Sequence, residues 1–406
     1  MGVAGVVLAL VTACTAPVSP APSTVSGPAV SVSSGTPTAI PGYVEAREGV
    51  DYEVLFDVPN PRPDGRTDGV LAVTPDGQAL VKRMKQTVPL SEHSQVLLKT
   101  ADGERVLPRV LAGPPRVAIY GAAHGVNTAW LETSSTQAGL TDWDLFGADN
   151  DGHVRHLAAS GDYDAGDGPS PPEATPVVVD ATRAYFTVVL PRKNRGTGNE
   201  REYRRAILAA PLDGSRPTII DDARLPAVGA DGLHFVRSTD ILTWDDSTTP
   251  ARGVAEFGVI PPGGQSRIVH TEKLAPGREI VGHCAVGDNL VWLTSNDAEG
   301  GRGHITILAP DGTRTTIPLN EDGFASYLTC GDGLIAWSGG GEDGTTEDAH
   351  GDIGQYVYSL ATRTTWRIGE NDIVSECMVN GKIVMVSSPA QNETGPVGSR
   401  VLRWLH

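Results

Sequence analysis

The chain has 406 residues and a formal net charge of −17, and 39% of its residues are hydrophobic. That length fits two or three average domains or one large repeat domain, with enough apolar residues for a core. The acidic balance disfavours nucleic acid and anionic lipid headgroups as partners. The 48 glycines and 30 prolines suit a fold of many short strands and tight turns. Arginine outnumbers lysine, with 6 lysines in all, as in GC-rich and plausibly actinobacterial genomes.

The first residues predict an export signal. A short apolar run from Val3 to Val11 leads into Val11-Thr12-Ala13-Cys14, and about ten apolar residues suit the core of a signal peptide better than a membrane-spanning helix. The run lacks the Lys or Arg that signal peptides carry, which suggests a start codon further upstream. The four residues that end at Cys14 resemble the lipobox of bacterial lipoproteins. That resemblance implies a signal peptide over 1–13, diacylglycerol on Cys14 and an extracytoplasmic, membrane-anchored protein. The alternative is a buried apolar strand with an incidental cysteine.

The next segment predicts a tether. Residues 15–41 consist of Ser, Thr, Pro, Ala, Gly, Val and Ile without a single charge. Such a composition buries too little surface to offset the entropy of ordering, so we expect 14–42 to be a lipidated, disordered spacer. The folded domain is then expected over 43–406.

A repeat of about fifty residues decides the predicted fold. Each instance has a short apolar strand, a turn with Gly, Asp or Asn, and a bulky residue five positions later. The bulky residues are Leu80, Trp130, Tyr185, Phe235, Trp292, Trp337 and Met385. A second hairpin follows each of them, as before Asp213-Gly214. Four strands in each of seven units, without helical periodicity, predict an all-β propeller with the bulky residues packed between blades.

The ends of the chain predict how the ring closes. The last unit supplies three strands, so its fourth is expected from Tyr52–Phe56, which would pair the N- and C-terminal strands and remove an open edge. Over 43–406 the chain resembles secreted, seven-bladed β-propeller repeats. It lacks the Trp-Asp signature of WD40 repeats and the Asp box of sialidases, so the residues of neither family are carried over.

Three cysteines remain after Cys14. Cys284, Cys330 and Cys377 lie 8, 7 and 8 positions before the bulky residues of three consecutive units. In an exported protein one disulfide between neighbouring blades is plausible, with one cysteine left free. The alternative is three buried thiols.

Charged loops mark a candidate binding face, because connections between second and third strands and between blades gather on one side of a propeller. The acidic candidates are Glu342, Asp343, Glu347, Asp348, His350 and Asp352. Asp162, Asp164 and Asp167 are weak candidates for Ca²⁺, as is the turn Asp149–Gly152, although solvated loops explain all of these acidic residues. Arg192, Lys193 and Arg195 could hold an anionic group or pair with acidic loops.

No catalytic motif is present: the sequence has no Gly-x-Ser-x-Gly, His-Glu-x-x-His or phosphate loop. His124 and His283 are placed near the ends of first strands, close to a channel mouth. We therefore expect a monomeric, protein-binding or scaffolding lipoprotein of the cell envelope without a cofactor. The alternatives are a propeller enzyme such as a glycan hydrolase or lyase, and a glycan- or solute-binding lipoprotein.

Overall fold

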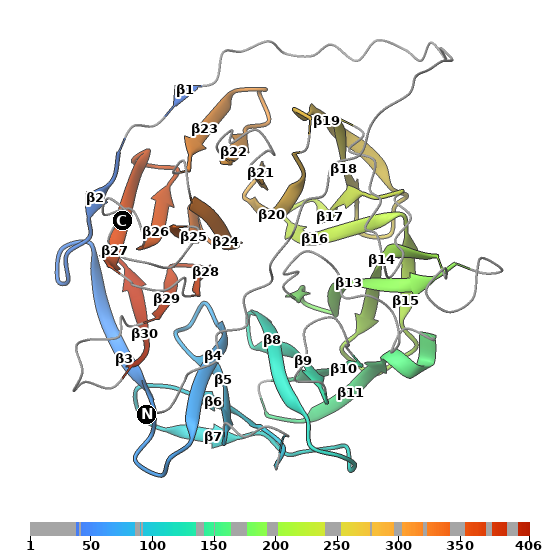
Figure 1. The fold of residues 1–406 in the computed structure, drawn as a ribbon, viewed down its shortest axis with the longest axis vertical. Coiled ribbons are helices and arrows are strands. Elements are labelled where there is room, and N and C mark those ends of the chain that lie inside the picture. Colours follow the sequence, from blue (N-terminus) through green and yellow to red (C-terminus); the bar gives the residue numbers. More distant parts are fainter. Residues whose placement is uncertain are drawn as a thin grey trace.

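The computed structural model describes residues 38–39, 42–85, 90, 92–134, 142–149, 151–163, 177–192, 202–239, 253–276, 278–295, 303–319, 323–341, 354–370, 376–387 and 397–406. Seven antiparallel sheets of four core strands are arranged around one axis (Figure 1). The prediction of an all-β, seven-bladed propeller is confirmed. In the described part of the chain no helix is long and apolar enough to cross a membrane.

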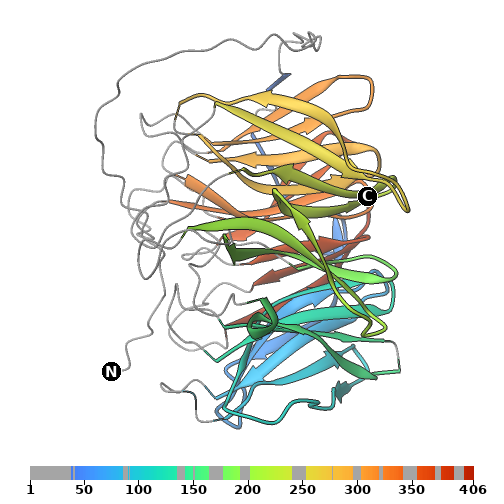
Figure 2. The same ribbon diagram turned by 90° about the vertical axis from the view of Figure 1, so that its right-hand side faces the viewer.

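The strands of each blade run up and down between the two faces of the ring (Figure 2). The first, innermost strands of blades 1 to 7 are β4 (Thr67–Val73), β8 (Val117–His124), β12 (Val178–Val179), β16 (Ala223–Gly229), β20 (Ile280–Val286), β24 (Gly323–Cys330) and β28 (Cys377–Asn380). The second strands are β5 (Ala79–Met84), β9 (Asn127–Thr133), β13 (Arg183–Pro191), β17 (Gly232–Arg237), β21 (Asn289–Thr294), β25 (Leu334–Gly341) and β29 (Ile383–Ser387).

The outer half of each blade follows the same order. The third strands are β6 (Gln95–Lys99), β10 (Asp144–Ala148), β14 (Tyr203–Pro211), β18 (Val254–Ile260), β22 (His304–Leu308), β26 (Gly354–Ser359) and β30 (Val397–Trp404). The fourth strands are β7 (Glu104–Val106), β11 (Val154–Ala159), β15 (Thr218–Asp221), β19 (Arg267–Lys273), β23 (Arg314–Pro318), β27 (Thr364–Glu370) and, in blade 7, β3 (Tyr52–Asn60). A short 3-10 helix, η1 (Ser160–Tyr163), follows β11.

The N-terminal strand closes the ring as predicted. β3 pairs antiparallel with β30, from Tyr52 opposite Trp404 to Asn60 opposite Val397. Upstream of β3 the chain also follows the rim, since β1 (Thr38–Ala39) pairs in parallel with β23 and β2 (Val44–Glu45) with β27. Residues 38–60 therefore contribute strands to three consecutive blades, which covers three outer edges that would otherwise be open.

The core lies between the blades. All seven bulky repeat residues are on second strands and none is more than 6% exposed. Trp130, for example, stacks on Phe146 of its own blade at a ring distance of 5.6 Å and packs against Leu71 and Leu80 of blade 1. The prediction that these residues form inter-blade core is confirmed.

Candidate functional site

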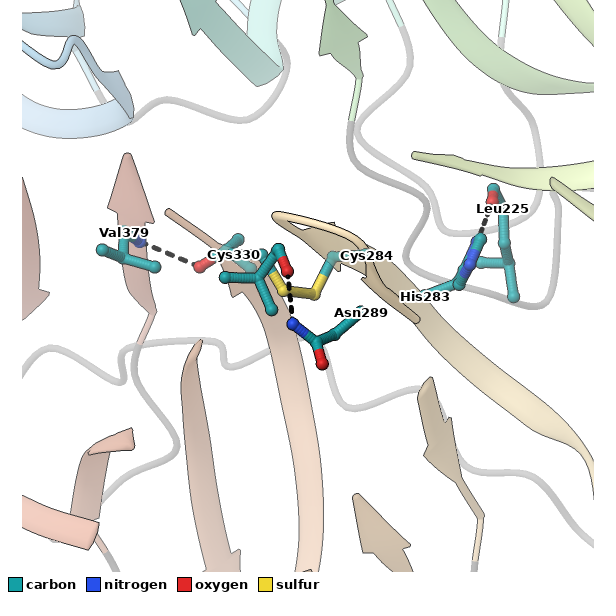
Figure 3. Close-up of a disulfide and its surroundings, with 8 residues drawn as sticks. Leu225, His283, Cys284, Asn289, Cys330 and Val379 are labelled. Atoms are coloured by element: carbon teal, nitrogen blue, oxygen red, sulfur yellow. Dashed lines mark hydrogen bonds between the residues drawn. A yellow bond between two sulfur atoms is a disulfide. The ribbon is translucent and has the colours of Figure 1, made fainter. Parts of the chain in front are cut away.

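Side-chain links join neighbouring blades close to the axis, and Figure 3 shows those of blades 4 to 7. His283 on β20 lies 3.0 Å, through Nδ1, from the carbonyl oxygen of Leu225 on β16. A disulfide joins Cys284 on β20 to Cys330 on β24, with their Cα atoms 5.8 Å apart. On β28, the amide of Val379 donates to the hydroxyl of Thr329 at 2.9 Å. The inner strands of four blades are thus tied in series.

The same kind of link continues around the other blades. Asn380 on β28 donates from its side-chain amide to the carbonyl oxygens of Val73 in blade 1 and Ala123 in blade 2, both at 2.8 Å. Asn127 of blade 2 donates to the carbonyl of Ala181 in blade 3. The backbone amide of Leu225 in blade 4 donates to the hydroxyl of Thr187 in blade 3 at 2.9 Å. The backbone amide of Ala118 in blade 2 donates to the hydroxyl of Ser94 in blade 1 at 2.9 Å. Every neighbouring pair of blades is therefore linked, so the ring is held by more than apolar packing.

Leu225 is the most constrained residue of this ring. Its φ is +51°, in the left-handed region that leucine rarely adopts, and it precedes Pro226 within a β-bulge of β16. Such a conformation costs about 1–3 kcal/mol and persists only where the surroundings impose it. Here both backbone polar groups of Leu225 are bonded to side chains of neighbouring blades.

His283 is held in its neutral form. Burial lowers the pKa of its imidazole to about 4, and the bond to Leu225 only partly opposes this. Because a carbonyl can only accept, the proton of the neutral ring is on Nδ1. The prediction placed His283 at a channel mouth, but it is 5% exposed and packed between Phe257 and His234. His124 does end its inner strand in an exposed position.

The charge of one carboxylate influences two titratable side chains of other blades. Lys82 is on β5 of blade 1, Tyr120 on β8 of blade 2, and Glu376 directly precedes β28 of blade 7. Desolvation lowers the pKa of the Lys82 ammonium, and the negative charge of Glu376 opposes that shift. Desolvation and the same carboxylate both raise the pKa of the Tyr120 hydroxyl. All three residues are half-buried.

The position of Lys82 depends on a glycine. Lys82 pairs in register with Gly69 of the inner strand β4, and a Cβ added at Gly69 would lie 3.0 Å from Cε of Lys82. The lysine side chain therefore lies across the inner strand where that strand has no side chain. This explains why a residue of a second strand is affected by Glu376, which belongs to the inner end of another blade.

The buried carboxylates of the described residues are held in ion pairs. Asp68, 2% exposed, receives Nε of Arg83 at 2.8 Å, and the same guanidinium binds Glu104 at 2.6 Å. Glu272 of blade 4 binds Arg314 of blade 5 at 2.6 Å. These ion pairs stabilise single blades and the contact between neighbouring blades. The carboxylates therefore have a structural role.

Glu132 and Asp144 are the buried carboxylates that stand opposite each other, on β9 and β10. Desolvation raises the pKa of Glu132, which also accepts a bond from Nε1 of Trp130. Arg109 lies 3.3 Å from Glu132, and Arg116 lies 2.8 Å from Asp144. A carboxyl group with a raised pKa suits a general acid, but Glu132 and Asp144 are each paired with their own arginine.

The predicted binding-face residues fall mainly outside the described residues. That is so for Glu342, Asp343, Glu347, Asp348, His350 and Asp352, and for Lys193, Arg195 and Cys14. Arg192 directly follows β13, and its guanidinium lies 4.0 Å from Glu202, which directly precedes β14. This is a contact within its own blade. Arg204 likewise pairs with Asp221 of its own blade.

The weak calcium candidates divide in the same way. Asp164 and Asp167 lie outside the described residues, whereas Asp162 lies in η1 and accepts a bond from the amide of Ala159 at 3.2 Å. Asp149, Asp151 and His153 bring possible metal-ligating atoms within 4.8 Å of one another. The carboxylate of Asp149 already accepts bonds from the amide and the ring of His153, as expected of a turn-forming aspartate.

Of the three cysteines, two form the disulfide that links blades 5 and 6, and Cys377 is a free, fully buried thiol. Burial raises its pKa strongly, which makes it unreactive in the folded protein. The residues that the sequence did not reveal are Lys82, Tyr120, Glu376 and Asn380. Of these, only Lys82 could have been indicated by the sequence, through its pairing with Gly69 across β5 and β4.

Comparisons with known proteins show the fold and no family. No protein-family model matches the chain, and no curated protein matches its sequence. Among solved structures, the propeller domain of the Trilobed protease from Pyrococcus furiosus is similar, with 8% identity, a TM-score of 0.50, and coverage of 84% of this chain and 95% of that one. That domain is described as having an open velcro topology, whereas β3 closes the ring here.

Two further structures are similar at the level of the fold. An acylaminoacyl peptidase in complex with a chloromethyl ketone gives 8% identity, a TM-score of 0.51, and coverage of 84% of this chain and 52% of the peptidase. The present chain thus spans about half the length of that enzyme. YCF48 bound to D1 peptide gives 10% identity and a TM-score of 0.44, with coverage of 89% and 98%. The chain is therefore a seven-bladed β-propeller similar in fold to the propellers of the Trilobed protease and the acylaminoacyl peptidase.

Proposed function

We propose that this chain is a protein-binding module of the bacterial envelope, anchored by a lipid on Cys14 and binding through one face of the propeller. The observation that carries the proposal is the closed ring of inter-blade links around the axis. Such a ring is a rigid support from which loops can present a binding surface. The described buried carboxylates serve in ion pairs, which favours binding over acid–base catalysis.

The binding face is the one at which the second strands end, here called the long-connection face. From this face the chain leaves β5 at Met84, β9 at Thr133 and β25 at Gly341 and returns only after connections of eight or more residues. The opposite face carries tight turns, such as those at Gly125 and Gly287, both with positive φ. Long connections offer variable side chains, whereas tight turns are fixed by their geometry.

Affinity capture tests the proposal. The tagged full-length chain is purified from detergent-solubilised envelopes beside a variant in which residues 342–352 are replaced by a short Gly-Ser linker. A variant with Asp311→Ser at a tight turn is the control. We expect the same protein partners with wild type and control, and their loss with the linker variant. Recovery of the same partners with the linker variant would contradict the proposal. So would a wild-type chain that recovers no protein beyond those recovered with an unrelated lipoprotein as bait.

A further inference from the structure

The N-terminal segment covers the outer edge of one blade after another. β2 lies parallel to β27 of blade 6, where the amide of Ala46 donates to the carbonyl oxygen of Arg367 at 2.9 Å. The Arg367 guanidinium donates to Glu45 at 2.7 Å, and its Cζ lies 4.7 Å from the ring centre of Tyr43. β1 lies parallel to β23 of blade 5 in the same way. Traced towards the N-terminus, the chain therefore passes along the rim from blade 7 to blade 6 to blade 5 (Figure 1).

The step from one blade to the next is six residues. β1 begins at Thr38 and β2 begins six positions later, at Val44, with residues 40–43 between the two strands. This connection contains one Pro and one Gly. Six positions before Thr38 the sequence has Val32-Ser33, and the four residues that follow, 34–37, again contain one Gly and one Pro. The sequence pattern of a short strand and a turn therefore occurs once more before β1.

The next edge along the rim is β19 of blade 4, which no strand covers in the described part of the chain. With seven residues it is longer than the other uncovered outer strands, β7, β11 and β15. Its Ile268 and Val269 are 41% and 36% exposed, whereas Trp366, opposite β2, is buried. An uncovered edge strand with adjacent exposed β-branched side chains favours the addition of a further strand.

We propose that Val32-Ser33 adds to β19 as a parallel strand beside Ile268, so that the N-terminal segment covers the outer edges of blades 4 to 7. This inference goes beyond the proposed function, and Val32-Ser33 lies outside the described residues. Ile268 has the same place on β19 that Thr315, opposite Thr38, has on β23. Each belongs to the second residue pair after the turn between the third and fourth strands. The β-branched side chain of Val32 suits a strand.

The geometry and the charges of this edge favour the chain's own segment over other occupants. Four residues link Val32-Ser33 to β1, the number that links β1 to β2 across the same step of the ring. A covalently attached segment has a local concentration on the order of millimolar, which a separate peptide does not reach. A second copy is disfavoured, because antiparallel pairing of two β19 strands about His270 would place the exposed Arg267 and Lys273 of the two copies opposite each other.

Hydrogen exchange of backbone amides tests the proposal on the purified full-length chain. The variant Val32→Pro/Ser33→Pro has no N–H at either position, so a hydrogen bond to β19 is lost whichever of the two amides faces it. Val25→Pro/Ser26→Pro makes the same change elsewhere in the N-terminal segment and is the matched control. We expect the amides of β19 to exchange about tenfold faster or more in the first variant, and at the wild-type rate in the control. The amides of β7, another uncovered edge, are the internal reference and should exchange equally in all three proteins.

Crosslinking with a short bismaleimide provides a second measurement. The pairs Val32→Cys/Ile268→Cys and Val25→Cys/Ile268→Cys are compared in a chain with Cys14→Ser, and the fully buried Cys377 does not compete. We expect the first pair to crosslink within one chain about tenfold faster or more than the second, because docking holds its two residues side by side. Equal crosslinking rates, or β19 exchange that the proline variant leaves unchanged, overturns the proposal. Protection of β19 that appears only in intact envelopes assigns this edge to a protein partner and likewise overturns it.

Discussion

Nδ1 of His283 lies 3.0 Å from the carbonyl oxygen of Leu225, across the boundary between blades 4 and 5. The bond joins a histidine kept neutral by burial to a leucine kept in a left-handed conformation. Through this bond, the stability of the ring depends on the pH at which the imidazole of His283 takes up a proton.

Acid is therefore expected to weaken the fold through His283. Its folded-state pKa of about 4 lies below the value of 6.5 for the free side chain, so the unfolded chain takes up a proton first. The stabilisation is complete above pH 6.5 and is lost as the pH falls towards 4, by about 3 kcal/mol. Urea unfolding at pH 7 and pH 4.5 measures the loss. His283→Asn, which retains a donor for Leu225, should lose distinctly less; an equal loss in both proteins would exclude His283 as the cause.

The disulfide between Cys284 and Cys330 encloses a separation of 46 residues. In the chain-entropy account a cross-link of this length stabilises the folded state by about 2–4 kcal/mol. The double variant Cys284→Ser/Cys330→Ser should unfold at correspondingly lower urea concentration. Thiol counting provides the check: with Cys14 replaced, alkylation should find no reactive thiol in the folded protein, one after denaturation and three after reduction.

Gly258 on β18 makes room for a repeat aromatic. It pairs with Phe235, and a Cβ added at Gly258 would lie 2.2 Å from Cζ of that ring. Gly258→Ala should force the ring aside and cost about 1–3 kcal/mol of unfolding free energy. Gly161→Ala is the matched control, because a Cβ there meets no atom within 4 Å. Thermal unfolding of the two variants compares them, and equal melting temperatures would contradict the packing described.

Closure by β3 is expected to be essential. β3 contributes the outer strand of blade 7, and its Tyr52 stacks on Trp404. A chain that begins after Asn60 would leave β30 as an open edge, which favours aggregation. Size-exclusion chromatography should show oligomers or loss of soluble protein. A soluble, cooperative monomer would show that the ring does not need this strand.

Much of the fold was predictable because each repeat has one bulky apolar residue at the same position. Trp292 and Trp337, for example, are one repeat apart. Tyr52–Phe56 was recognisable as the fourth strand that the last repeat lacks. The influence of Glu376 on Lys82 and Tyr120 was not predictable, since the three residues belong to blades 7, 1 and 2. Lys82 and Gly69 are adjacent only through strand register, and Glu376 acts on Lys82 from the other end of the sequence. Arg192 lies in a charged segment that is evident in the sequence, but its contact with Glu202 is evident only in the structure.

Photo-crosslinking from the two faces of the propeller tests the central claim most directly. A photoreactive amino acid is placed at Lys85 or Ser134 on the long-connection face, and at Val126 or Asp288 on the tight-turn face, all four positions being exposed. We expect crosslinks to a partner protein from the first two positions in intact envelopes and none from the other two. Crosslinks from the tight-turn face alone, or equally from both faces, would contradict it.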